Sequence, residues 1–211
     1  MLVYLYYFFM VVSFITSLFY LRHKKIKILS SLLFLSIATE MGVEVMSAKG
    51  FNYFILYHFF TITEYALITL LLRDSMRIHP IRKVMLYSIF IFAAFSLFIS
   101  FRVQEFRQFP TIGNSIEGLL VITWCILALW FIDANYNTTI FQRPDFWFIV
   151  SFLVYFSGTI AFNGIYNYLL RDKTATDRNL FSIINSFCNY LLYILLIIGI
   201  SRYKWKKYIP Q

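Results

Sequence analysis

Seven runs of apolar residues, each long enough to cross a bilayer as a helix, follow one another along this 211-residue chain. The runs are continuously apolar rather than alternating, which favours helices over membrane β-strands. The connections between them are short, as in helix bundles. We therefore predict an all-α polytopic membrane protein, one seven-helix transmembrane domain over residues 1–211, with helices at about 2–20, 28–48, 52–73, 83–100, 115–133, 146–168 and 180–201.

Composition supports the bilayer as the solvent of this chain. Hydrophobic residues make up 60% of the sequence and charged residues only 14%, whereas soluble domains average about 25% charged residues. Almost every residue falls in a predicted helix or a short loop, which excludes a separate soluble catalytic module. The formal net charge of +9 is typical of membrane proteins that keep lysine and arginine on one side, and no basic patch predicts nucleic-acid binding.

The distribution of lysine and arginine predicts an orientation. The loops after the first, third and fifth helices and the C-terminal tail carry most of the 19 basic residues, and the richer side is expected to be cytoplasmic. The N-terminus is therefore predicted outside and the C-terminus inside, in a multi-pass protein of a bacterial inner membrane. The basic tail at residues 202–207, RYKWKK, fits either a surface anchor to anionic lipid or a docking point for a partner.

Polar side chains inside the apolar runs are the candidates for function. In the second helix Ser36, Glu40 and Glu44 are spaced by four residues and share one helical face. The third, fifth, sixth and seventh helices also carry carboxyl, amide or hydroxyl groups. The candidate ligand-binding residues are Glu40, Glu44, His58, Thr61, Glu64, Glu117, Tyr155, Asn163, Asn185 and Asn189.

Depth places these candidates together. At about 1.5 Å per residue, Glu40 and Glu64 each lie about 18 Å from the start of their helix, near mid-membrane. The other candidates map between that depth and the outer surface. The pattern predicts a polar cavity among helices two, three, five, six and seven that opens to the outside, above a comparatively apolar inner half. The first and fourth helices have few polar groups, which predicts scaffold or lipid-facing roles.

Two explanations compete for such buried polar groups. Single serine, threonine or asparagine side chains often serve only to join helices by hydrogen bonds. Carboxyls are more costly, at roughly 2.5–3.5 kcal/mol each on insertion scales, and apolar replacements would insert more easily. We therefore expect Glu40 and Glu64 to be functional, either ionised or protonated as hydrogen-bond donors, with His58 as the one cationic candidate nearby.

Several chemistries lack their residues in this sequence. No predicted helix has a mid-depth lysine that could hold retinal, and the three histidines cannot form the metal site of ceramidase-type hydrolases. No known catalytic, nucleotide-binding or phosphate-binding motif occurs in a usable context. We predict no catalytic residue, metal or cofactor, although a carboxylate site of Glu40, Glu44 and Glu64 stays open for a metal. Cys125 and Cys188 lie inside apolar runs and are expected to be unpaired core residues.

The segments FILYHFFTITEYALITLLL at residues 54–72 and PDFWFIVSFLVYFSGTIAF at 144–162 resemble small uncharacterised seven-helix membrane proteins of Bacteroidota-type bacteria. Some of those proteins look like membrane sensor regions that work beside histidine kinases. The resemblance implies signalling through a separate partner and identifies no catalytic residue.

Three functions remain open at this point. A sensor or receptor would bind a small or lipidic ligand in the outer cavity and signal to a cytoplasmic partner. A small-molecule or proton-coupled transporter would use Glu40 or Glu64 as its titrating group, and it would need a polar path through the inner half. An intramembrane lipid-modifying enzyme would need two carboxyls close together and a water path. We take the receptor as the leading hypothesis, since it needs only the outer cavity, and we place the enzyme last of the three. The chain has no output domain, so the receptor would need a separate partner.

Overall fold

All regular structure is helical in the part of the chain that the computed structural model describes, which is residues 2–76, 78–132, 139–171 and 175–205. The predicted all-α class is confirmed. Side chains are placed for residues 5–76, 78–132, 139–160 and 183–203. The described elements are α1 (Leu2–Leu18), α2 (Lys24–Ala48), α3 (Phe54–Arg73), α4 (His79–Arg102), α5 (Thr111–Trp130), the short 3₁₀ helix η1 (Ile140–Gln142), α6 (Pro144–Arg171) and α7 (Ala175–Trp205).

Proline and glycine set several helix boundaries. Pro80 lies in the first turn of α4, Pro110 is the N-cap of α5 and Pro144 is the first residue of α6, positions where a missing backbone N–H costs nothing. The predicted starts of α4 and α5 were therefore about four residues late. Gly50 ends α2 with a φ of 72°, and the Phe51 N–H returns to the Met46 carbonyl at 2.9 Å, as in glycine-terminated helices.

Five of the helices are long and apolar enough to cross a membrane. They are Lys24–Ala48, Phe54–Arg73, His79–Arg102, Thr111–Trp130 and the Ile183–Tyr203 part of α7. The stretches Leu5–Leu18 and Pro144–Ile160 are apolar but shorter within the described residues. Helix length and hydropathy together thus indicate a membrane protein.

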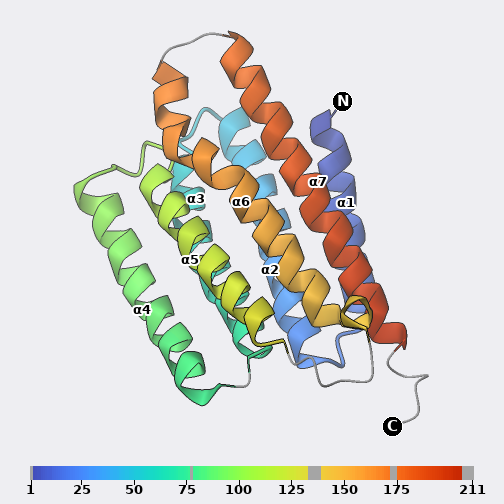
Figure 1. Cartoon of the computed structure of the whole chain (residues 1–211). Coiled ribbons are helices and arrows are strands. Elements are labelled where there is room, and N and C mark those ends of the chain that lie inside the picture. Colours follow the sequence, from blue (N-terminus) through green and yellow to red (C-terminus); the bar gives the residue numbers. More distant parts are fainter. Residues whose placement is uncertain (1, 77, 133–138, 172–174, 206–211) are drawn as a thin grey trace.

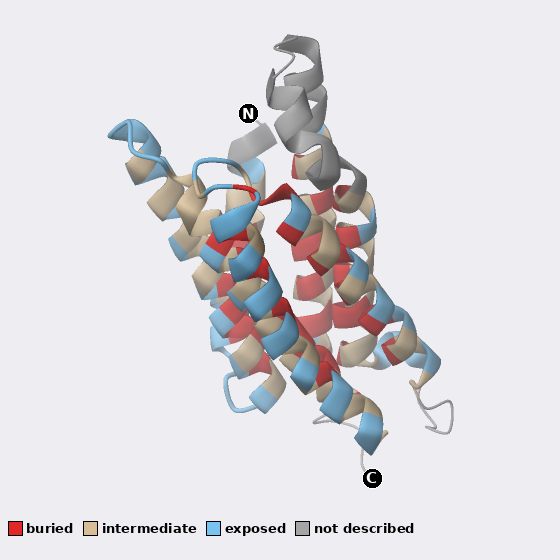
Figure 2. Cartoon of the chain, turned by 90° about the vertical axis from the view of Figure 1, so that its left-hand side faces the viewer, coloured by how far each residue is buried: buried red, intermediate tan, exposed pale blue. Residues whose placement is uncertain are grey.

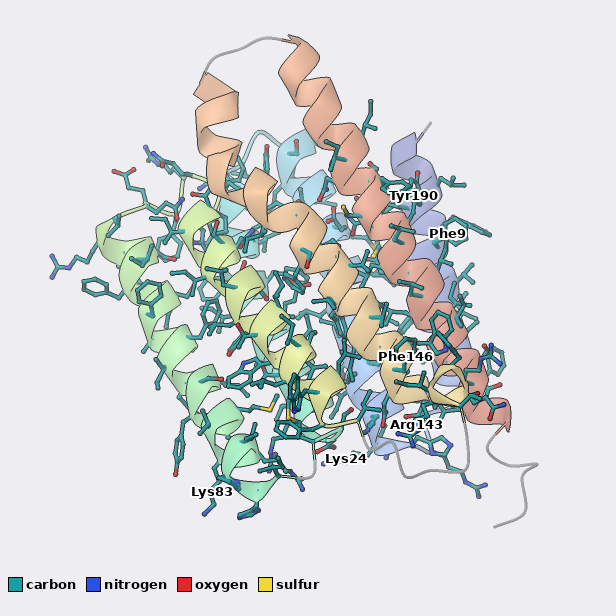
Figure 3. All side chains as sticks on the ribbon, viewed as in Figure 1. Phe9, Lys24, Lys83, Arg143, Phe146 and Tyr190 are labelled. Carbon is teal, nitrogen blue, oxygen red and sulfur yellow. The ribbon has the colours of Figure 1, made fainter. Side chains whose placement is uncertain are left out.

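Six of the helices form a closed ring, and α4 packs outside it. Going around the ring, α1 contacts α2, α2 contacts α3, α3 contacts α5, α5 contacts α6, α6 contacts α7, and α7 returns to α1. The fourth helix packs against α3 and α5, at the side of the bundle away from α1 and α7 (Figure 1). In Figure 3, Phe9 of α1 lies beside Tyr190 of α7, and their ring centroids are 6.1 Å apart.

One end of the ring, which we call the core end, is filled by apolar side chains. It comprises the first turns of α2 and α6 and the last turns of α1, α3, α5 and α7. Figure 2 shows the buried residues on the sides of the helices that face one another. Fully buried side chains at this end include Ile26, Leu29, Leu33, Ile68, Leu72, Cys125, Phe148, Phe152, Leu196 and Ile200. The expectation that Cys125 is an unpaired core residue is confirmed, and Cys188 is likewise free and buried.

Packing at the core end leaves no spare room. A Cβ added to Gly199 of α7 would meet the ring of Phe148 of α6 at 2.6 Å, so these two helices approach as closely as glycine allows.

Within the described ranges, three ion pairs border the core end. Lys24 lies 2.8 Å from Asp74, Lys25 lies 2.7 Å from Asp145, and Arg82 reaches Asp74 at 3.9 Å. They connect the start of α2 to the end of α3, to α4 and to α6. Lys24 marks this end in Figure 3.

Candidate ligand cavity

The opposite end of the ring, which we call the cavity end, encloses a polar cavity of about 380 Å³. All six helices of the ring contribute to its walls, whereas α4 contributes none of the described lining residues. Together with the Phe109 side chain that precedes α5, the walls are formed by Tyr6, Tyr7, Glu40, Val43, Glu44, Ser47, Tyr53, Tyr57, Phe60, Thr61, Glu64, Asn114, Glu117, Tyr155, Phe156, Asn185 and Asn189.

Four glutamates from three helices face this cavity. Glu40 and Glu44 come from successive turns of α2, Glu64 from α3 and Glu117 from α5. Glu44 is exposed, whereas Glu117 is buried, with 2% of its surface exposed. The cavity therefore runs from the molecular surface into the interior of the ring.

The carboxyls are close enough to influence one another. Glu64 interacts electrostatically with Glu40, and Glu117 interacts with Glu64. Like charges at such range repel each other strongly away from water. Four carboxyls thus share one small space with no basic residue among the described lining.

The hydrogen bonds of the cavity leave one buried acceptor free. The Tyr7 hydroxyl donates to Glu40 Oε2 at 3.3 Å, and the Thr61 hydroxyl donates to Asn114 Oδ1 at 2.6 Å. Glu117 Oε1 is buried and has no hydrogen-bond partner among the side chains and backbone groups that the structure describes. A buried carboxyl oxygen without a partner is costly, which makes Glu117 the least satisfied side chain among the carboxyls of the cavity wall.

Aromatic rings form much of the remaining wall. Tyr6 and Tyr7 pack with their ring centroids 4.3 Å apart, and Tyr57 meets Phe109 edge to face at 5.4 Å. Tyr155 and Phe156 pack against each other as well, at 5.1 Å. These rings combine apolar faces with hydroxyl groups, so the wall can contact both hydrocarbon and polar parts of a ligand.

Basic side chains are absent from the described lining. The residues around the cavity include no lysine, arginine or histidine. The prediction that His58 lies beside the carboxyls as a cationic partner is wrong, because its ring is held elsewhere. Its ring nitrogens contact Ser100 Oγ at 2.7 Å and the Gln108 carbonyl at 3.0 Å, so it joins α3 to the end of α4 and the following loop.

A narrower space of about 60 Å³ extends the cavity toward the core end. Ser36, Thr39, Glu40 and Glu64 line it together with Tyr193. Tyr57, Phe60, Tyr155 and Asn189 are shared with the larger cavity, and the remaining walls are buried apolar residues of the core: Leu32, Leu33, Phe152, Leu192 and Leu196. The polar surface thus stops at an apolar floor.

Most of the predicted site residues meet in this one place. Eight of them line the cavity: Glu40, Glu44, Thr61, Glu64, Glu117, Tyr155, Asn185 and Asn189. His58 does not, and the side chain of Asn163 lies outside the described residues. Whether the eight bind a ligand remains a prediction.

The first helix was assigned the wrong role by its sequence. We expected α1 to be scaffold or to face lipid, yet its Tyr6 and Tyr7 complete the cavity wall, and Tyr7 contacts Glu40. Tyrosines near the end of a span are usually interfacial anchors, so the available signal supported the other interpretation. The expectation for α4 fits its place outside the ring.

Another groove, of about 590 Å³, lies on the outside of α1, α2 and α3. Its walls include exposed Phe34 and Leu21 with Lys27, and it contains no carboxyl. Such a membrane-facing groove is suited to lipid chains, so the polar cavity is the better candidate site.

The carboxyls of the cavity do not form a metal centre. Among the described residues, no group of three or more histidine, cysteine, aspartate or glutamate side chains lies close enough to hold a metal ion. The option of a metal at Glu40, Glu44 and Glu64 therefore has no geometric support. The carboxyls are better placed to touch different parts of one larger ligand.

No protein-family model matches this chain, and no curated protein and no solved structure matches it either.

Proposed function

We propose that this chain is a seven-span receptor of a bacterial inner membrane, which binds a small molecule from outside and signals to a cytoplasmic partner. In this proposal the N-terminus and the cavity end face outward, and the core end with the C-terminus faces the cytoplasm. The basic residues in the loops at the core end support that orientation through the positive-inside rule.

The observation that carries the proposal is a polar cavity that ends on an apolar floor. The cavity begins at exposed Glu44, passes Glu40 and Glu64, and stops at Leu33 and Phe152. A transporter needs a second polar path beyond this floor, and a receptor does not. Among the described residues that are buried at the core end, the polar side chains are the hydroxyls of Ser17, Ser30, Thr69 and Ser151, without a carboxyl or amide. This supports the receptor over the transporter.

The second helix offers a physical route for the signal. Its outer half carries Glu40 and Glu44 in the cavity wall, and its first turn carries Lys24 and Lys25 in the ion pairs of the core end. A ligand that draws the two glutamates toward it would shift one continuous helix and so bias those pairs between two arrangements.

Fluorescent reporters at the core end would test this proposal. Arg22→Cys, just before α2, and Lys83→Cys, on α4 outside the ring, are both exposed, and the native cysteines are buried. The labelled proteins would be exposed in liposomes to fractions of a culture-medium extract. We expect an active fraction to change the Arg22 reporter and leave the Lys83 reporter unchanged. An Asn114→Trp variant, which fills the cavity, should not respond.

The same liposomes separate the receptor from the transporter. The active compound should remain outside them over the time that the reporter responds. Saturable accumulation inside wild-type liposomes, blocked in Asn114→Trp, would overturn the receptor proposal in favour of a carrier. Chemical conversion of the compound would instead point to the enzyme alternative.

A further inference from the structure

We infer that the cavity takes an organic cation, a metabolite-sized compound with an amine or quaternary ammonium group. This names the ligand class of the receptor proposed above and rests on that proposal only for its biological meaning. The inference stands on three separate features of the cavity: its charge, its aromatic wall and the unpartnered oxygen of Glu117.

Charge disfavours an anionic ligand and favours a cationic one. Four carboxyls line the cavity, and no described lining residue is basic. An anionic ligand would meet repulsion with no compensating group, whereas a cationic ligand would pair with the carboxyls. A cation lowers the repulsion among Glu40, Glu64 and Glu117. Around the cavity, Glu40 interacts electrostatically with Glu64, and Glu64 with Glu117.

Geometry favours an organic cation over a bare ion. The acidic side chains do not converge as a metal centre requires, as judged from the described residues. The space of about 380 Å³ falls within the range of about 300–1,000 Å³ that is typical of sites for small organic molecules. An ammonium compound can fill that space and still reach carboxyls that lie on different helices.

The aromatic wall supplies the second recognition element. Rings from three of the ring helices and from the loop before α5 surround the carboxyls: Tyr6, Tyr7, Tyr53, Tyr57, Phe60, Phe109, Tyr155 and Phe156. Ring faces attract ammonium groups through their quadrupoles, most strongly where water is excluded. Carboxylates combined with aromatic faces are the usual means by which proteins bind amines and quaternary ammonium groups.

Glu117 marks where the charged group would sit. Its side chain is 2% exposed, lines the cavity, and has no partner for Oε1 within the described part of the chain. An amine N–H would donate directly to this oxygen, and a quaternary ammonium group would compensate its charge. Glu64, which interacts electrostatically with Glu117 across the cavity, would also pair with the ammonium group of the ligand.

Titration of the full-length protein with choline provides the first test. Its neutral carbon isostere, 3,3-dimethyl-1-butanol, has the same shape without the charge. We expect calorimetry to give a saturable choline signal, with the neutral isostere at least about tenfold weaker. Equal binding of the two, or no binding of choline, benzylamine or tetramethylammonium by the folded protein, would overturn the inference. This comparison needs no variant.

Matched variants locate the site. Glu117→Gln and Glu64→Gln should each weaken choline at least about thirtyfold, since each removes one partner of a desolvated charge pair. Glu105→Gln makes the same change on an exposed loop residue and should leave binding unchanged. Thermal unfolding without ligand verifies that each variant is folded. If both cavity variants bind as the wild type does, the charge has been assigned to the wrong place and the inference fails.

The ammonium group could belong to a free metabolite or to a lipid headgroup, and the membrane composition separates them. In nanodiscs of phosphatidylglycerol alone, choline should bind in either case. In phosphatidylcholine nanodiscs, a lipid-headgroup site would already be occupied and the choline signal would disappear, whereas a site for free metabolites would still bind.

The reporters separate the two proposals. If no cation binds but a neutral compound from the extract moves the Arg22 reporter, the ligand class fails and the receptor stands. If choline binds and accumulates inside liposomes with a silent reporter, the receptor fails and the ligand class stands.

Discussion

The core end and the cavity end of the ring are made from the same helices but stabilised in opposite ways. At the core end Phe148, Phe152 and Leu196 fill the interior, and Gly199 lets α6 and α7 meet closely. At the cavity end the helices stand around a polar space, and Glu117 keeps an oxygen without a partner. Close apolar packing is concentrated at one end, and the polar space at the other.

The difference matters because lipid is as apolar as the core. Helices in a bilayer associate by packing and hydrogen bonding rather than by exclusion from water. Close packing at the core end therefore holds the six ring helices together, and the cavity end can change shape while the helices stay packed. Four pairs of substitutions test this contrast. Each pair makes a similar change at two sites, one tightly packed or buried and the other open or exposed.

Removing a large ring should give the largest difference. Phe152 is 1% exposed, and Phe152→Ala should lower the free energy of unfolding by about 3 kcal/mol. This is the low end of the range for a buried phenylalanine, because a ring moved from the core into lipid loses packing contacts but does not enter water. Phe60→Ala borders existing space and should cost less than about 1 kcal/mol. Denaturant titration in detergent measures both. Equal costs would contradict the division into two ends.

Filling space should give the next largest effect. Gly199→Ala places a methyl group 2.6 Å from Phe148 Cε1 and 3.1 Å from Trp147 Cβ, and overpacking of this kind costs about 1–3 kcal/mol. Gly42→Ala meets only the flexible tip of Leu56, at 3.0 Å, and should be nearly neutral. The same unfolding titration applies. A tolerated Gly199→Ala would mean that α6 and α7 separate more readily than their packing indicates.

Neutralising Glu117 should stabilise the protein without ligand. Glu117→Gln keeps an oxygen in place but removes the charge from a buried side chain that has no basic residue beside it in the described cavity wall, so it should raise the free energy of unfolding by about 1 kcal/mol. Glu105→Gln, on the exposed loop, should change nothing. A destabilised Glu117→Gln would show that this carboxyl serves the fold rather than a ligand.

The smallest difference is expected at the ion pairs. The Lys25 side chain is 18% exposed and contacts both Asp145 and Ser75, whereas the Lys24 side chain is 74% exposed. Lys25→Ala should cost about 1 kcal/mol and Lys24→Ala less than about 0.5 kcal/mol, since exposed pairs contribute little. Raising the salt concentration should shrink the Lys24 effect first. A larger cost for Lys24→Ala than for Lys25→Ala would show that the pair of Lys24 with Asp74 contributes more than the pair of Lys25 with Asp145.

The sequence was sufficient for the helices because apolar length is a strong signal. Proline positions could have improved the boundaries, as Pro110 directly precedes the first turn of α5. The order of the ring was beyond prediction, because it depends on which helices pack together, and short loops allow several arrangements. The place of α4 outside the ring is the clearest case.

The candidate site was predictable to the extent that it follows helical faces. Glu40 and Glu44 share a face of α2, and Thr61 and Glu64 share a face of α3, so both pairs meet in the cavity. His58 is one position beyond Tyr57, and one position turns a helix by about 100°. That turn points the imidazole at Ser100 instead of the cavity. Sequence adjacency alone could not reveal this.

Closure of the ring by α1 against α7 has a consequence for biosynthesis. The cavity takes Tyr6 and Tyr7 from the first helix in chain order and Asn185 and Asn189 from the last. During insertion Glu40, Glu64 and Glu117 therefore enter the membrane before the final wall of their site exists. A chain that stops before α7 would leave these three carboxyls without the last wall of their cavity, at a cost in free energy that the complete ring reduces.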